Sequence, residues 1–191
     1  MASSNTKRNK EARHDDLYST PKEAVDFLIG TYGEMLKHNR FGVLEPCCGL
    51  GAISEPMSEY GVDVDSIDLY DHGYGIPHTD FLNWQPQKKY SWVVMNPPFK
   101  LTEEFVDKAL EVCEEGVLMF NRLTTLESIG RATKFSNGTW PLSHVHIFGY
   151  RVSCPEGPEM KPSPNSVAYA WYVFDKQKHP MAEPTISWIL K

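Results

Sequence analysis

Residues 43–51 read V-L-E-P-C-C-G-L-G, a short apolar run that leads through an acidic residue and a proline into a glycine-rich turn. Glycine has no Cβ, so the backbone of such a turn bends tightly and approaches a ligand directly. Residues 52–54, A-I-S, are expected to open a helix. A dinucleotide fingerprint requires a third glycine three residues after Gly51, and that position holds Ser54. The stretch therefore predicts a strand, a turn and a helix around a ligand other than a nicotinamide or flavin cofactor.

Apolar runs alternate with helical stretches along the rest of the chain, which is typical of a parallel sheet covered by helices. One helix is expected from Pro21 to about His38, with Thr20 as its N-cap. A second, amphipathic helix is expected over residues 101–114. The strand-like runs are residues 42–44, 62–68, 92–95, 117–120, 145–148 and 168–174, and a further short strand is expected to end near Asp80. The sequence therefore predicts an α/β fold.

The length of 191 residues suits one domain. Residues 1–16 are polar and charged and are expected to form a disordered arm, so that residues 17–191 make up a single domain. Residues 151–166 carry four prolines between two strand-like runs and predict a long loop. No apolar run approaches about 20 residues and the N-terminus is polar, so we expect no membrane partner and a cytoplasmic location.

Charge and cysteine content restrict the function further. The net charge of -6 opposes long-range attraction of a polyanion by the protein as a whole. The four cysteines form no C-x-x-C pair, and the seven histidines show no H-E-x-x-H or paired spacing with cysteine. Reduced thiols and no metal site are therefore expected.

Acidic residues stand at the ends of predicted strands. Glu45 leads directly into the glycine turn, which suits a ligand with a positively charged amino acid end and no pyrophosphate; S-adenosylmethionine fits that description. Asp68 stands 17 residues after Gly51, about the offset at which a strand-end carboxylate accepts hydrogen bonds from ribose hydroxyls. Asp80 is expected to accept from an adenine amino group while Phe81 packs on the ring.

The tetrapeptide Asn96-Pro97-Pro98-Phe99 directly follows the predicted strand that ends at residue 95. Two prolines remove two backbone donors and hold the chain extended, which leaves carbonyl oxygens and the Asn96 side-chain oxygen as acceptors. Open α/β sheets bind ligands at this end of their strands. Such acceptors hold a planar amino group and weaken its delocalisation, so that its nitrogen attacks a methyl group. Phe99 offers a face on which a base stacks.

In this order the motifs resemble those of class I S-adenosylmethionine-dependent methyltransferases, and within them the amino-methylating enzymes with a D/N-P-P-Y/F motif. The nearest likeness is to adenine-N6 DNA methyltransferases, particularly the short forms carried by phages and prophages, and it covers residues 18–191. Y-S-T-P at 18–21 is similar to the Y-x-T-P element of these enzymes, which lies against the methionine end of the cofactor. The resemblance implies a Rossmann-like, seven-stranded, mostly parallel sheet with one antiparallel strand around residues 169–174 and helices on both faces.

The resemblance also implies the site residues. The catalytic residues would be Asn96, Pro97, Pro98 and Phe99. The cofactor S-adenosyl-L-methionine, with S-adenosyl-L-homocysteine as product, would be held by Tyr18, Thr20, Pro21, Glu45, Pro46, Cys47, Gly49, Gly51, Asp68, Leu69, Asp80, Phe81 and Asn96. Basic residues near the same edge interleave with aromatic residues: Lys100, Arg122, Arg131, Lys134 and Arg151, with Phe135, Trp140 and Tyr150. With Phe99 we expect them to form a short substrate platform; the alternative is that they are solvated charges beside aromatic residues of the core.

The molecule that accepts the methyl group is the part of the function that the sequence defines least. Sequence-specific members of the family carry a sizeable target-recognition domain, whereas the residues after Phe120 are only enough to finish the sheet. We expect methylation of the N6 amino group of adenine in DNA by direct displacement. Methylation of RNA adenine or of the N5 of a protein glutamine uses the same planar amino group and is the first alternative. A noncatalytic S-adenosylmethionine-binding regulatory protein is the second, and the sequence names no oligomeric state.

Overall fold

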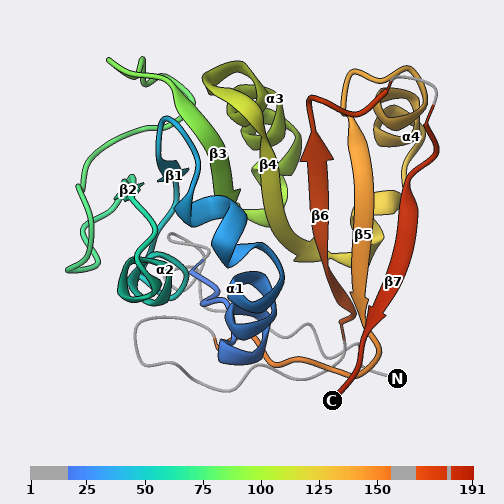
Figure 1. Cartoon of the computed structure of the whole chain (residues 1–191), viewed down its shortest axis with the longest axis horizontal. Coiled ribbons are helices and arrows are strands. Elements are labelled where there is room, and N and C mark those ends of the chain that lie inside the picture. Colours follow the sequence, from blue (N-terminus) through green and yellow to red (C-terminus); the bar gives the residue numbers. More distant parts are fainter. Residues whose placement is uncertain (1–16, 156–166, 180–181) are drawn as a thin grey trace, which may run out of the picture.

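A seven-stranded sheet runs through the protein in the order β2-β1-β3-β4-β6-β5-β7, from β2 at one edge to β7 at the other (Figure 1). The computed structural model describes residues 17–155, 167–179 and 182–191. The strands are β1 (Val43–Glu45), β2 (Val64–Ser66), β3 (Tyr90–Met95), β4 (Cys113–Arg122), β5 (Leu142–Phe148), β6 (Tyr169–Asp175) and β7 (Thr185–Ile189). Only β6 runs antiparallel to its neighbours, which are β4 and β5. The predicted fold class is confirmed, including the single antiparallel strand.

Helices cover both faces of the sheet. They are α1 (Lys22–Lys37), α2 (Ser54–Tyr60), α3 (Thr102–Val112) and α4 (Ile129–Ser136), with short 3₁₀ helices at Phe99–Leu101 and Leu123–Leu126. One buried cluster joins α1 and α2 to the face that includes Val43, and the other joins α3 to the face that includes Leu44. Successive residues of a strand point to opposite faces, so two adjacent residues of β1 supply both clusters.

The seventh strand is not the one that the sequence predicted. Within the described residues no strand ends near Asp80; the segment makes only an isolated bridge between Ile67 and Ile76. Left-handed backbone at Gly73, Gly75 and His78 is the physical reason, because a strand needs extended residues throughout. The seventh strand is instead β7, which pairs in parallel with β5 at the opposite edge.

Two predicted helix boundaries also differ. Helix α1 begins at Lys22 with Pro21 at the N-cap position and no side-chain cap, so the prediction of Thr20 as the N-cap is wrong. The Thr20 hydroxyl instead accepts a hydrogen bond from Asn96. The helix predicted over residues 101–114 ends at Val112, because β4 is already extended at Cys113 and pairs there with β3.

Two sequence predictions concern residues that the structure does not describe. The predicted arm over residues 1–16 and residues 156–166 of the predicted loop lie outside the described residues. Among the residues that are described, no helix is both long and apolar enough to span a bilayer.

Candidate functional site

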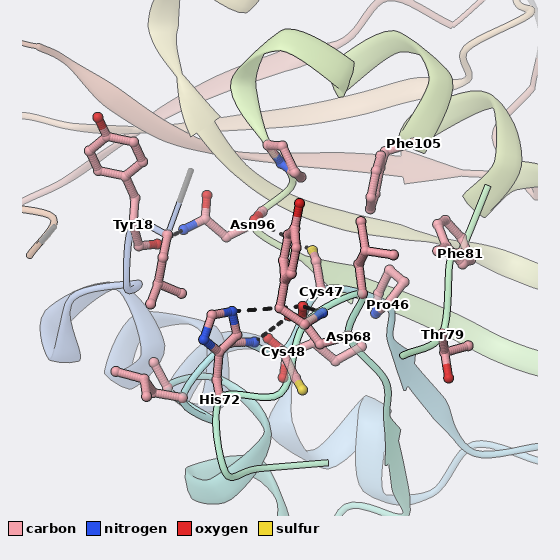
Figure 2. A pocket seen from close by; sticks show the side chains of 18 of the residues that line it. Tyr18, Pro46, Cys47, Cys48, Asp68, His72, Thr79, Phe81, Asn96 and Phe105 are labelled. Atoms are coloured by element: carbon pink, nitrogen blue, oxygen red, sulfur yellow. Dashed lines mark hydrogen bonds and ion pairs between the residues drawn. The ribbon is translucent and has the colours of Figure 1, made fainter. Parts of the chain in front are cut away.

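A pocket lies where β1, β2 and β3 end at their carboxyl edge. Its lining includes the predicted cofactor residues Tyr18, Thr20, Glu45, Pro46, Cys47, Gly49, Asp68, Leu69, Asp80, Phe81 and Asn96, together with Pro98. Tyr18 and Asn96 lie on one side and Phe81 and Phe105 on the other, with Asp68 between them (Figure 2). Two predicted residues, Pro21 and Gly51, are buried and do not line the pocket.

The glycine turn after β1 forms one wall of the pocket. Gly49 and Gly51 have φ values of 53° and 83°, which favour glycine. A Cβ on Gly49 would stand 2.8 Å from Leu17 Cδ1, and one on Gly51 would stand 2.7 Å from the Tyr74 ring. Both positions therefore depend on the missing side chain, and Gly51 shapes the turn from behind without facing the pocket.

Asp68 ties the end of β2 to this turn. Its Oδ2 accepts from the Gly49 amide at 2.8 Å and its Oδ1 accepts from the Tyr70 amide at 2.9 Å. A carboxylate has about four lone-pair sites, so each oxygen keeps capacity for a ligand hydroxyl. His72 Nε2 lies 3.9 Å from Asp68 Oδ1, and its side chain lines the pocket. The sequence interpretation missed His72; the only signal was a histidine four residues after the strand-end aspartate.

Glu45 lies buried beneath the glycine turn. It accepts a hydrogen bond from Ser54, and the Ser66 hydroxyl donates to the Ser54 hydroxyl at 2.6 Å. Burial raises the pKa of Glu45 to about 8, although the hydrogen bonds from Ser54 oppose the rise. Ser54, which occupies the position of the third glycine of a dinucleotide site, therefore serves as the partner of a buried carboxyl group.

The two adjacent cysteines of the turn are protonated thiols. Burial raises the pKa of Cys47 well above its usual value and that of Cys48 to about 12. The Cys47 thiol donates to the Asn96 carbonyl at 3.5 Å. Because the thiolate is the nucleophilic form of cysteine, neither side chain is suited to covalent catalysis at neutral pH.

Asn96 presents a fixed acceptor to the pocket. Its Nδ2 donates to the Tyr18 carbonyl at 2.8 Å and to the Thr20 hydroxyl at 3.1 Å. Both amide hydrogens are thus used, and no residue in the described part of the chain hydrogen bonds to Oδ1. Pro97 is buried, and within the same part of the chain no group donates to its carbonyl oxygen.

Phe99 lies outside the pocket wall, in an aromatic cluster. Its ring centroid is 5.2 Å from that of Tyr18 and 6.3 Å from that of Tyr169. The Arg122 guanidinium stacks on Phe99, with Cζ 3.7 Å from the ring centroid. The structure therefore brings two of the predicted substrate residues, Phe99 and Arg122, into direct contact.

Three other residues of the predicted substrate platform, Arg131, Lys134 and Trp140, have partners within the protein. Arg131 donates to the carbonyl oxygens of Thr124, Thr125 and Glu127 and pairs with Glu103, and Lys134 pairs with Asp107. Trp140 is wholly buried and donates to Asp107, so its predicted place in a substrate platform is wrong: packing against α3 and α4 takes it into the core. Lys100 and Arg151 are exposed, and their substrate role stays a prediction.

Solved structures of methyltransferases have a similar fold. A candidate RNA methyltransferase from Pyrococcus horikoshii superposes with a TM-score of 0.63 at 16% identity, over 89% of this chain and 90% of that one. The M protein of the type I restriction enzyme EcoKI gives a TM-score of 0.62 at 16% identity, over 86% of this chain but 45% of that one. The chain has the class I methyltransferase fold. Magnesium protoporphyrin IX methyltransferase from Synechocystis PCC 6803, solved with bound S-adenosylmethionine, gives a TM-score of 0.54 at 12% identity over 80% of this chain and 78% of that one.

These identities are low, and the likeness extends to the fold alone. No family model matches the chain. Among the described residues no three or more His, Cys, Asp or Glu side chains are grouped as a metal site would require.

Proposed function

We propose that this protein is an S-adenosylmethionine-dependent N-methyltransferase whose acceptor is a planar amino group, first of all the N6 amino group of adenine in DNA. The observation that carries the proposal is the orientation of Asn96. Its amide hydrogens are occupied by Tyr18 and Thr20, which leaves Oδ1 as an acceptor beside a pocket that is lined by a glycine turn and a strand-end carboxylate. The class I methyltransferase fold of the structural neighbours supports the same reading.

The pocket residues fit the cofactor. Asp68 has lone pairs left for the ribose hydroxyls, and Gly49 lines the pocket with its backbone alone. Phe81 lines the wall with its ring packed on Phe105, at a centroid distance of 5.3 Å, and suits the adenine. When bound, S-adenosylmethionine supplies an electrophilic methyl group on a sulfonium. The protein holds this group and an acceptor nitrogen in line, and most of its contribution is positioning.

The acceptor nitrogen needs its lone pair freed from delocalisation. Asn96 Oδ1 and the Pro97 carbonyl are two acceptors with no hydrogen-bond donor among the described residues. Accepting both hydrogens of an amino group favours a tetrahedral nitrogen over a planar one, so the lone pair becomes available. Fixed dipoles of this kind need no reorganisation during the reaction, which is why they are effective.

The stacked pair of Phe99 and Arg122 favours a base over a glutamine side chain as acceptor. A purine offers a π face to an aromatic ring, whereas a primary amide offers a much smaller planar area. DNA comes first because neighbours include the M proteins of type I restriction enzymes, and RNA remains an alternative through the Pyrococcus horikoshii neighbour. The net charge of -6 predicts that nonspecific affinity for either polymer is weak.

The test is incubation with methyl-labelled S-adenosylmethionine and double-stranded DNA, single-stranded DNA, RNA or a glutamine-containing protein extract, followed by digestion and mass spectrometry. Labelled N6-methyladenine in DNA supports the proposal. Label only in RNA or in glutamine reassigns the acceptor, and no label with any acceptor, despite calorimetric binding of the cofactor, contradicts the enzymatic proposal. Asn96→Ala is the matched variant, since it should lose transfer while its cofactor affinity stays near that of the wild type.

A further inference from the structure

The orientation of the Asn96 amide is dictated by the segment that precedes α1. A carbonyl oxygen only accepts hydrogen bonds, so the NH₂ side of the amide must face Tyr18 O, which lies 2.8 Å from Nδ2. The second hydrogen is then directed to the Thr20 hydroxyl at 3.1 Å. If the amide were rotated by half a turn, Asn96 Oδ1 would face the Tyr18 carbonyl oxygen, and two acceptors would repel each other. The hydrogen bond from Asn96 Nδ2 to the Thr20 hydroxyl would also be lost.

Thr20 is held firmly enough to define this geometry. It is 6% exposed, and its hydroxyl is not used to cap α1, where Pro21 takes the N-cap position without a side-chain bond. On its other side the Ser19 amide donates to the Pro155 carbonyl at 3.0 Å, which fixes the segment against the chain that follows β5. The hydroxyl therefore reaches Asn96 from a segment anchored at both ends.

Asn96 is also held through its backbone. The Cys47 thiol donates to the Asn96 carbonyl at 3.5 Å, so the glycine turn supports the residue from below while residues 18–20 support its side chain. With the backbone fixed, the remaining freedom of Asn96 is rotation of its side chain, and the Thr20 hydroxyl opposes that rotation directly.

We propose that Thr20 is a positioning residue that holds the Asn96 amide with Oδ1 toward the acceptor, an inference that rests on the proposed methyl transfer. This role differs from the contact with the methionine end of the cofactor that the Y-x-T-P resemblance implies. The two roles predict different measurements. A cofactor contact changes the dissociation constant of the cofactor, whereas a positioning residue changes the rate of transfer when the cofactor is saturating.

The test uses Thr20→Val, which keeps the shape and loses the hydroxyl, with Thr20→Ser as the conservative variant. Thr133→Val on α4 is the matched control, because its hydroxyl bonds only within its own helix. Thr20→Val should lower the single-turnover rate at saturating cofactor by roughly three- to tenfold, the effect of one hydrogen bond, with cofactor affinity unchanged by calorimetry. Thr20→Ser should restore the rate, and Thr133→Val should not alter it. A wild-type rate in Thr20→Val, or a change confined to cofactor affinity, overturns the proposal.

A second readout separates this inference from the proposed function. The side-chain amide resonances of Asn96 in ¹⁵N-labelled protein, assigned by their loss in Asn96→Asp, report its hydrogen bonds without any acceptor. Thr20→Val should raise the exchange rate of one Asn96 amide hydrogen roughly fivefold, and Thr20→Ser should not. Unchanged exchange in Thr20→Val overturns the positioning role even if the enzyme is active. If the wild type transfers no methyl group, the proposed function fails, and the amide resonances still decide whether Thr20 positions Asn96.

Discussion

The guanidinium carbon of Arg122 lies 3.7 Å from the centroid of the Phe99 ring, so the end of β4 is stacked on the last residue of the N-P-P-F motif. The Nε of Arg122 is buried without a hydrogen-bond partner among the described residues. A planar cation stacks on an aromatic face with little entropy loss. The contact thus holds the ring that is proposed to meet the acceptor.

Arg122→Lys is expected to weaken acceptor binding and to leave the cofactor unaffected. A lysine ammonium has no planar face and cannot stack on Phe99 in the same way. The KM for the acceptor should rise by about three- to tenfold, which is the scale of a partly buried cation–π contact. Cofactor affinity by calorimetry should stay the same, because Arg122 does not line the pocket.

Arg131→Lys is the control for this prediction. Its guanidinium donates to three backbone carbonyls of residues 124–127, which precede α4, so the variant should lose stability and keep the acceptor KM. An increase in acceptor KM for Arg131→Lys as large as for Arg122→Lys would show that the basic residues act together as a substrate platform.

Asp68→Ala is expected to weaken the cofactor site in two ways. It removes the carboxylate that is proposed to accept from the ribose hydroxyls, and it leaves the Gly49 and Tyr70 amides without the group that accepts from them at 2.8 and 2.9 Å. Cofactor affinity and the free energy of unfolding should each fall by about 1–3 kcal/mol. Asp68→Asn keeps one acceptor oxygen, so its cofactor affinity and its free energy of unfolding should lie between those of the wild type and those of Asp68→Ala. Calorimetry with S-adenosylhomocysteine and urea unfolding measure the two effects, and unchanged affinity in Asp68→Ala would remove this residue from the site.

Glu45 should make stability depend on pH. Burial raises its pKa to about 8, against 4.5 as its ordinary value, so the folded protein keeps a proton that the unfolded chain releases. The stabilisation is therefore fully present below about pH 4.5 and is lost as pH rises through about 8. Relative to Glu45→Gln, which stays neutral, the wild type should lose up to about 1.4 kcal/mol of unfolding free energy per pH unit between these limits. Urea unfolding of both proteins across this range measures the difference, and parallel curves would contradict the raised pKa.

Local patterns predicted the site better than the edges of the fold. E-P-C-C-G-L-G and N-P-P-F each combine an apolar run with glycine or proline, so strand and turn are encoded within a few residues, and both stand at the carboxyl ends of β1 and β3. Strand β7 reads T-I-S-W-I and alternates polar with apolar residues, but it is only five residues long, four of them are exposed, and no glycine or proline motif adjoins it as in the other two stretches.

The errors arose where a distant partner decides the role of a residue. Thr20 matches an N-cap pattern locally, but its hydroxyl bonds to Asn96, 76 residues away in the sequence. Trp140 stands among basic residues in the sequence, yet the direction of its side chain is set by packing against α3, and it is wholly buried. The spacing of residues along the chain indicates neither the hydrogen bond of Thr20 to Asn96 nor the burial of Trp140.

Two glycines should respond oppositely to alanine. A Cβ on Gly116 would overlap the Phe174 carbonyl oxygen and stand 2.6 Å from the Trp92 ring, inside the pairing of β4 with β6. Neither neighbour can yield without disturbing the sheet, so Gly116→Ala should lower the free energy of unfolding by about 3 kcal/mol. Gly30 is exposed within α1 with nothing within 4 Å of its added Cβ, so Gly30→Ala should raise it by about 1 kcal/mol through the lower helix propensity of glycine. Urea unfolding of the two variants and the wild type measures both changes. If Gly116→Ala were as stable as Gly30→Ala, the sheet would not be packed this closely at Gly116.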